Sequence, residues 1–144
     1  MEYNRNKYNF SYSFRVRYSE VDAQGIVFNA HYLTYFDCAI TEYFRKINYN
    51  YAMEVKKKKQ DFHVIKTTIN YKAPILFDQI IDACIRVSYI GNSSLRFEVS
   101  LFENSKNNLL ALGEIIQVYA DQIKNKSIPL PADLLLKIKK FENI

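Results

Sequence analysis

Residues 22–32, which read DAQGIVFNAHY, are the part of the chain whose side chains could do chemistry. They bring a carboxylate, Asp22, close in sequence to the amide of Asn29 and the imidazole of His31. The apolar pattern that follows predicts that a helix begins here, and a helix start presents unpaired backbone N–H groups and the positive end of the dipole. Such N–H groups polarise a carbonyl and stabilise an oxyanion. A carboxylate across from them suits attack on an acyl carbonyl, directly or through water.

The same residue types are also typical of positions without chemistry. Asp22 is a common turn residue. Asn29 is a common N-cap, whose side chain accepts a hydrogen bond from a backbone N–H of the first helical turn. The composition of this stretch alone leaves both interpretations open.

Scarce residues exclude several other kinds of site. The 144 residues include two Cys and two His, with no CxxC or HExxH spacing, so we expect no metal site. No phosphate-binding P-loop occurs, and the Gly91-x-Ser93 sequence lacks the second glycine of a hydrolase nucleophile elbow. Cys38 and Cys84 have apolar neighbours in the sequence and are expected to be reduced core residues.

The sequence shows no segment for export or for crossing a membrane. Its first residues, MEYNRNK, have no apolar signal region. No uncharged apolar run reaches the roughly 18 residues of a membrane helix. We therefore expect a cytoplasmic protein with no integral membrane segment.

The net charge of +5 comes from one half of the chain. Residues 1–72 hold twelve Lys and Arg against seven Asp and Glu, whereas residues 73–144 hold eight of each. Four of the positive charges form one run, Lys56, Lys57, Lys58 and Lys59. Such a run is typical of a solvated loop, whereas nucleic-acid binders usually cluster basic residues along an element. We therefore expect no nucleic-acid partner.

Two periodicities indicate the elements that must position residues 22–32. Apolar and polar residues alternate over 12–18, as in a half-buried strand. From residue 30 to residue 47 apolar residues recur every three or four positions, which predicts a helix of about five turns, roughly 27 Å long. Its apolar face is wide, so we expect other structure to enclose most of it. Residues 48–61 are expected to form an irregular connection.

The rest of the chain is predicted to be a sheet closed by a short helix. The expected strands are residues 63–72, 81–89, 95–101 and 109–119. Short polar turns between them imply antiparallel pairing. Pro131 can begin a final helix. An antiparallel sheet curled around one buried helix covers the apolar surfaces of both, which predicts an α+β architecture.

Three segments carry a resemblance to a known family. Residues 18–36, YSEVDAQGIVFNAHYLTYF, followed by Thr41-Glu42-Tyr43, resemble the signature of the 4-hydroxybenzoyl-CoA thioesterase family, which includes the YbgC-like acyl-CoA thioesterases. Residues 69–78 (INYKAPILFD) and 91–95 (GNSSL) are similar to the second and third blocks of that family. The resemblance extends from about residue 14 to residue 130 with its spacing kept.

The resemblance implies a fold, an assembly and a reaction. The fold is the hotdog: an antiparallel five-stranded sheet curled around one long central helix, with residues 1–144 as a single domain. The assembly is a homodimer whose sheets join edge to edge, or a homotetramer of two such dimers, with each active site drawing on two chains. The reaction is hydrolysis of an acyl-CoA thioester to a carboxylic acid and coenzyme A, without a further cofactor.

The resemblance also implies roles for individual residues. Asp22 matches the catalytic carboxylate, as nucleophile or general base, and Asn29 lies where a backbone N–H meets the thioester carbonyl. YbgC-like sequences often have His at that position and Asn two residues on, so the order Asn29, His31 keeps the backbone role and leaves the part of His31 open. Ser93 and Ser94 lie in a turn near the path of pantetheine or the nucleotide, although small residues also suit a tight hairpin.

Two other functions stay compatible with the same residues. A non-catalytic hotdog protein that binds acyl-CoA would keep the pocket without needing Asp22. A hotdog dehydratase or hydratase normally brings a catalytic histidine, for which His31 is the candidate. The loop 22–25 fits the thioesterase signature better than either.

Overall fold

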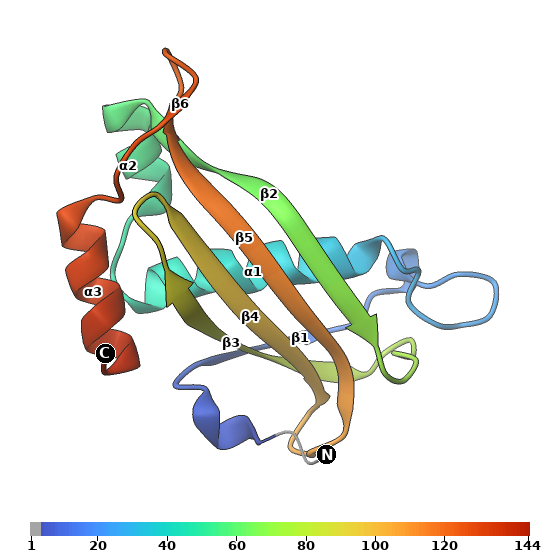
Figure 1. The fold of residues 1–144 in the computed structure, drawn as a ribbon. Coiled ribbons are helices and arrows are strands. Elements are labelled where there is room, and N and C mark those ends of the chain that lie inside the picture. The colour runs from blue at the N-terminus through green and yellow to red at the C-terminus, as the bar shows by residue number, and fades with distance from the viewer. Residues whose placement is uncertain (1–3) are drawn as a thin grey trace.

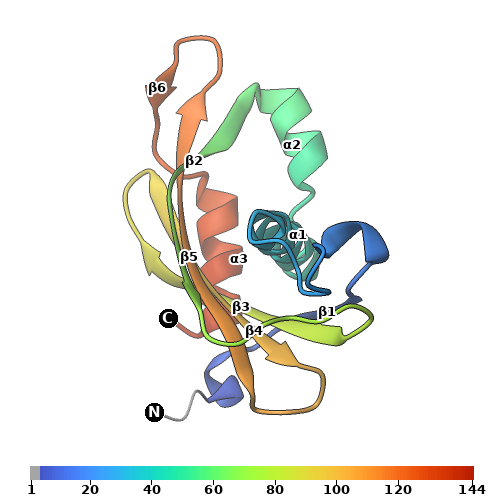
Figure 2. The same cartoon turned by 90° about the vertical axis from the view of Figure 1, so that its right-hand side faces the viewer.

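One long helix crosses the concave face of a single antiparallel sheet (Figures 1 and 2). The computed structural model describes residues 4–144. Its strands are β1 (Ser11–Arg15), β2 (Gln60–Tyr71), β3 (Ile80–Ile90), β4 (Ser94–Glu103), β5 (Leu109–Asp121) and the short β6 (Lys126–Ser127). Its α-helices are α1 (His31–Lys46), α2 (Tyr51–Lys58) and α3 (Ala132–Glu142). The five long strands lie in the order β1-β3-β4-β5-β2, and β6 pairs with β5.

The inner face of α1 is buried against the sheet because its apolar residues recur every three or four positions. The buried residues are Tyr32, Tyr35, Phe36, Ala39, Ile40, Tyr43 and Phe44. The helix approaches the sheet so closely that a Cβ built on Gly113 of β5 would lie 2.6 Å from the Phe36 ring. Only a residue without a side chain fits between this ring and the strand.

The expectation that other structure encloses most of α1 is wrong for the single chain. The side of α1 turned away from the sheet is exposed, including Leu33, Asp37 and Cys38. The sheet covers one face only, and within residues 4–144 no second layer lies over the other (Figure 2). Cys38 is therefore not a core residue, whereas Cys84 is buried as expected; both are free thiols.

The strand predictions are confirmed with small shifts in their ends. Hairpins join β3 to β4 and β4 to β5, as the short turns predict. The strand β2 pairs with β5 instead of its sequence neighbour β3, which places β2 at one edge of the sheet. Near the middle of this edge strand, Val64 is 50% and Ile65 is 63% exposed. A free edge with apolar side chains is a surface that pairs readily with another strand.

Two segments differ from what the sequence predicts. Residues 48–61 are not irregular: Asn50 caps α2 by accepting a hydrogen bond from the Met53 N–H at 3.2 Å. The strand predicted to reach Tyr18 ends at Arg15, and Tyr18–Glu20 form a 3-10 turn. The predicted final helix is confirmed as α3, with Leu134 and Ile138 buried.

Residues 5–8, which precede β1, are anchored on the convex face of the sheet. The Arg5 guanidinium donates to the Asp82 carboxylate at 2.8 Å, and the Tyr8 hydroxyl donates to Glu98 at 2.8 Å. Both carboxylates lie on the convex face because alternate residues of β3 and β4 point away from α1. No helix in residues 4–144 is long and apolar enough to cross a membrane.

Candidate functional site

A tight hairpin turn fixes the position of Asp22. The Asp22 N–H donates to the Ile26 carbonyl at 2.9 Å, and the Gly25 N–H donates to the Asp22 carbonyl at 3.0 Å. Gly25 has a φ of 77°, in the left-handed region that favours glycine. The Gln24 N–H donates to Oδ1 of Asp22 at 2.8 Å, so the backbone orients one carboxylate oxygen. The side chain itself is exposed in the single chain.

The segment after this turn is held against residues 75–76, which fixes the start of α1. The Val27 N–H donates to the Ile75 carbonyl at 2.8 Å, and Ile26 forms a β-bridge with Leu76. The Phe28 N–H donates to the Glu20 carbonyl at 2.9 Å. Backbone bonds therefore set the distance between Asp22 and the helix.

The start of α1 leaves backbone N–H groups free. The helix is capped at Ala30 with no side-chain hydrogen bond, so the alternative in which the Asn29 side chain caps it is wrong. The Asn29 carbonyl accepts from the Tyr32 N–H and from the Tyr71 hydroxyl, both at 3.4 Å. Within residues 4–144, the N–H groups of Asn29 and Ala30 have no hydrogen-bond partner. These two donors, at the positive end of the helix dipole, suit a carbonyl oxygen that gains negative charge.

Asp22 and Asn29 line one open cavity of about 470 Å³. The full lining is Asp22, Ile26, Val27, Phe28, Asn29, Tyr32, Tyr71, Lys72, Ala73 and Pro74. Sequence reasoning did not assign Tyr71 and Lys72 to the site, although both lie in the 69–78 segment that carries the resemblance. Lys72 places a positive charge in the cavity that holds Asp22.

Aromatic rings form the inner wall of this cavity. Tyr32 is buried and its ring lies edge-on to the ring of Tyr71, with centroids 4.8 Å apart. Burial raises the pKa of the Tyr32 phenol, so this ring stays neutral. The wall therefore offers an apolar surface beside the polar helix start.

The structure does not place the other predicted residues in this cavity. His31 is the first residue of α1, half-buried, and its ring lies edge-on to Phe28 with centroids 6.1 Å apart. Ser93 lies in the β3–β4 turn, and Ser94, the first residue of β4, pairs with Val118 of β5. Tyr71 pairs with Ala111 of the same strand, so seven residues of β5, roughly 23 Å, separate Ser94 from the cavity.

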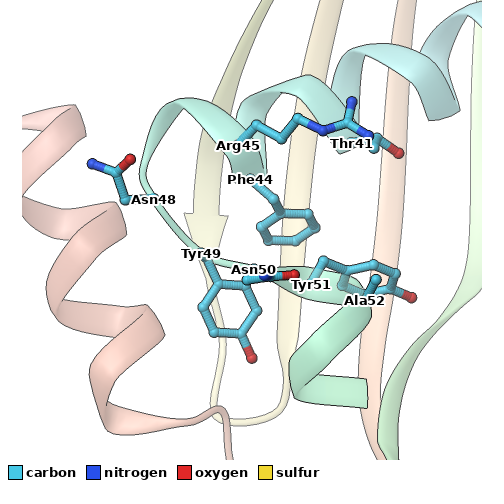
Figure 3. A pocket seen from close by; sticks show the side chains of 8 residues that line it. All are labelled: Thr41, Phe44, Arg45, Asn48, Tyr49, Asn50, Tyr51 and Ala52. Atoms are coloured by element: carbon cyan, nitrogen blue, oxygen red, sulfur yellow. The ribbon is translucent and has the colours of Figure 1, made fainter. Parts of the chain in front are cut away.

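Two other cavities lack a free carboxylate. A cavity of about 440 Å³ at the carboxyl end of α1 is lined by Thr41, Phe44, Arg45, Asn48, Tyr49, Asn50, Tyr51 and Ala52, with no Asp, Glu, His or Cys among them (Figure 3). A cavity of about 560 Å³ beside β1 contains Glu20 and Asp78. Glu20 accepts from the Tyr35 hydroxyl at 3.0 Å, and Asp78 pairs with Arg15 at 3.2 Å. A third cavity, of about 280 Å³, contains the Asp37 carboxylate of α1 but not Asn29. The cavity of Asp22 joins a carboxylate to the free N–H donors at the start of α1.

A sequence profile of the thioesterase-like superfamily matches residues 16–138, which is most of the chain. The chain belongs to the thioesterase-like superfamily. Its fold is the hotdog fold of that superfamily, as the resemblance implies. Within residues 4–144, no group of three or more His, Cys, Asp or Glu side chains could hold a metal ion.

Two bacterial acyl-CoA thioesterases are similar in sequence to most of this chain. The chain is 28% identical over 130 residues to the acyl-CoA thioester hydrolase YbgC of Escherichia coli O6:H1, covering 90% of this chain and 96% of the relative. It is 28% identical over 125 residues to the acyl-CoA thioesterase YbgC of Haemophilus influenzae, covering 87% and 90%.

Solved structures share the fold of this chain at lower sequence identity. The DHNA-CoA thioesterase of Staphylococcus aureus matches with a TM-score of 0.85 at 21% identity, covering 92% of this chain and 90% of that chain. The 1,4-dihydroxy-2-naphthoyl-CoA thioesterase Slr0204 of Synechocystis matches with a TM-score of 0.84 at 16% identity, covering 90% and 94%.

Proposed function

We propose that this protein is an acyl-CoA thioesterase, which hydrolyses an acyl-CoA thioester to a carboxylic acid and coenzyme A. The observation that carries the proposal is the shared cavity of Asp22 and Asn29, where a carboxylate lies near two unpaired backbone N–H groups. Membership of the thioesterase-like superfamily and the names of the YbgC relatives support it.

In the proposed reaction the N–H groups of Asn29 and Ala30 hold the thioester carbonyl oxygen. These donors stabilise the negative charge that this oxygen gains when the carbonyl carbon is attacked. Because they belong to the backbone, this role needs no particular side chain at residue 29. The order Asn29, His31 is therefore compatible with it, and His31 is at most an orienting residue.

Asp22 supplies the attack in one of two ways. Its carboxylate either bonds to the carbonyl carbon, giving a mixed anhydride that water then opens, or takes a proton from a water molecule that attacks instead. In both routes the carbon–sulfur bond breaks and one water molecule is consumed; where water attacks the acyl carbon, its oxygen ends in the acid. A thiol of pKa ~8.5 leaves as its thiolate without a strong general acid, so a site without one is sufficient. We propose no cofactor besides the coenzyme A of the substrate.

We also propose that the active unit is a homodimer joined at the free edge of β2, with a homotetramer of two dimers as the larger form. The edge exposes Val64 and Ile65, and the outward side of α1 beside it is open. The distance between Asp22 and the predicted coenzyme A residues Ser93 and Ser94 supports the same assembly. A second chain would have to bring its own Ser93 and Ser94 toward the cavity.

The test is a panel of short, long, branched and aromatic acyl-CoAs, with release of the thiol measured for each. We expect at least one substrate to be hydrolysed, by a particle that sediments as a dimer or tetramer at micromolar concentration. Coenzyme A binding without turnover of any substrate would instead identify a non-catalytic binding protein. Release of water from a 3-hydroxyacyl-CoA, with the thioester intact, would identify a dehydratase.

A further inference from the structure

Five lysines gather at one end of the sheet, and we call this group the lysine tip: Lys56, Lys57, Lys59, Lys124 and Lys126. The end of α2 and the β5–β6 turn supply them, and the Gln122 N–H joins the two segments by donating to the Lys59 carbonyl at 3.0 Å. Gln60 pairs with Asp121, which pairs on its other side with Lys126. Figure 1 shows α2 and β6 at the end of the sheet opposite the start of α1.

The lysine tip is available to a ligand because its members are not neutralised within the chain. None of the five forms an ion pair with another described residue, whereas their neighbour Lys58 pairs with Glu54 at 2.9 Å. The nearby acids have other partners. Asp121 accepts from the N–H groups of Ile123 and Lys124, and Asp61 accepts from the Phe62 N–H.

The lysine tip lies too far from the cavity of its own chain to act there. The cavity contains Tyr71, the last residue of β2, and the lysine tip begins just before Gln60, the first. These ends of an extended strand are roughly 36 Å apart.

In the proposed dimer, the lysine tip of one protomer comes close to the cavity of the other. Two strands related by a two-fold axis perpendicular to their sheet are antiparallel. With that axis at the middle of β2, beside the exposed Val64 and Ile65, the first residue of one β2 lies opposite the last residue of the other. The lysine tip of one protomer then lies beside Tyr71 and Lys72 of the other. The cavity of each chain, which contains its own Lys72, would then gain a further positive flank from its partner.

We infer that the lysine tip of one protomer binds the phosphate groups of the coenzyme A whose thioester lies in the cavity of its partner. The inference rests on the proposed function and dimer. Lysine is a suitable residue for this role, because its ammonium group is a mobile point charge that binds phosphates without fixed geometry. The lysine run is then part of the substrate site instead of a solvated loop.

The test compares two pairs of adjacent lysines, each in the last turn of a helix. Lys56→Glu/Lys57→Glu reverses charge in the lysine tip, and Lys139→Glu/Lys140→Glu is the matched control on α3. We expect the first variant to raise KM for an acyl-CoA about tenfold at low salt, with kcat kept, and the control to leave KM unchanged. The same acyl group on N-acetylcysteamine, which has no phosphates, should show equal KM in all three proteins. An unchanged KM for acyl-CoA, or an equal rise for both substrates, would overturn the inference.

A mixed dimer tests whether the lysines act on the partner. One chain carries Asp22→Asn with an intact lysine tip, and the other carries Lys56→Glu/Lys57→Glu with Asp22 intact. The one cavity that retains Asp22 then faces the intact lysine tip, so we expect the wild-type KM. A KM as high as that of the homodimer in which both chains carry Lys56→Glu/Lys57→Glu would show that the lysines act within their own chain.

Binding measurements separate this inference from the proposed function. Calorimetric titration with coenzyme A and with pantetheine, which lacks the phosphates, requires no turnover. If no thioester is hydrolysed, the proposed function fails, while a tenfold loss of coenzyme A affinity confined to Lys56→Glu/Lys57→Glu would still support the lysine tip. Equal coenzyme A affinity in the variant and the control would reject it.

Discussion

Two carboxylates on opposite faces of the sheet, Asp22 and Asp82, have opposite surroundings. Asp82 is 6% exposed on the convex face and accepts from the side chains of Arg5, Ser13 and Asn104 and from the Ser105 N–H. Asp22 is exposed on the concave side, and its side chain accepts from the Gln24 N–H only, within residues 4–144. The lone pairs of the Asp82 carboxylate all accept hydrogen bonds, whereas most of those of the Asp22 carboxylate remain available to a substrate.

The difference separates a structural carboxylate from one available for chemistry. A buried carboxylate must be fully hydrogen-bonded or its burial costs several kcal/mol, so the donors around Asp82 are a condition of folding. They also leave it no lone pair for a substrate. Asp22 forgoes that stabilisation and stays able to attack or to accept a proton. Backbone hydrogen bonds fix the turn that carries Asp22, so its carboxylate is held in place while most of its lone pairs stay available.

The largest effect that we expect is on activity. Asp22→Asn should lower kcat for an acyl-CoA by at least about 100-fold, because the amide can neither attack nor take a proton. The melting temperature should stay within a degree or so, since the side chain is exposed. Thiol release and thermal unfolding, measured on the same preparation, check both statements. Undiminished turnover would remove Asp22 from the site.

Asp82→Asn should show the reverse pattern, a loss of stability without a loss of kcat. Burial alone would raise the pKa of Asp82, but hydrogen bonds from Asn104, Ser13 and Arg5 lower it to about 2, from an ordinary value of 3.8. A carboxylate with a depressed pKa stabilises the folded chain above its unfolded pKa, and this stabilisation disappears as pH falls through the folded pKa. We therefore expect the variant to be less stable by about 2 kcal/mol at pH 7, with the gap closing between about pH 4 and pH 2.

Urea unfolding of the wild type and of Asp82→Asn at several pH values measures this difference in the free energy of unfolding. Glu103→Gln is the control, because Glu103 is an acid at the end of β4 whose partner Lys106 is an exposed neighbour at 3.1 Å. Lys106 lowers the pKa of Glu103 as well, but this pair is exposed and screened by solvent, so the Glu103→Gln variant should lose much less stability than Asp82→Asn at pH 7. A difference in stability for Asp82→Asn that is independent of pH would mean that the pKa of Asp82 is the same in the folded and the unfolded chain.

The sequence predicts most of the helices and strands well, because the apolar residues of each recur at one regular spacing. The apolar spacing of residues 30–47 is enough to predict α1, and alternation is enough for β3 and β4. The sequence misses the exposure of α1 and the helix α2 for a common reason. A wide apolar helix face can be enclosed or left open, and a lysine run can lie in a loop or at the end of a helix. Contacts between residues remote in sequence, such as the one between Gln122 and Lys59, decide the outcome.

The candidate site is predictable only where it is local in sequence. Asp22 and Asn29 belong to one turn and one helix start, so their proximity follows from the segment itself. Tyr71 and Lys72 join them through backbone bonds between the 26–27 and 75–76 segments, which no local pattern encodes. Ser93 and Ser94 require a second chain in the proposed site, and this is a relation that no reading of one chain can test.

The smallest effect that we expect sharpens the contrast between side chain and backbone at the helix start. Asn29→Ala should change kcat by less than about threefold, because the proposed donor is the N–H group, which alanine keeps. Ala30→Pro is the matched variant: the φ of Ala30, −68°, is one that proline adopts, so the substitution removes one of the two free N–H groups and preserves its φ. It should lower kcat by at least about tenfold, consistent with the loss of an oxyanion donor. A large loss in Asn29→Ala together with none in Ala30→Pro would assign the carbonyl to the amide side chain and remove the backbone from the reaction.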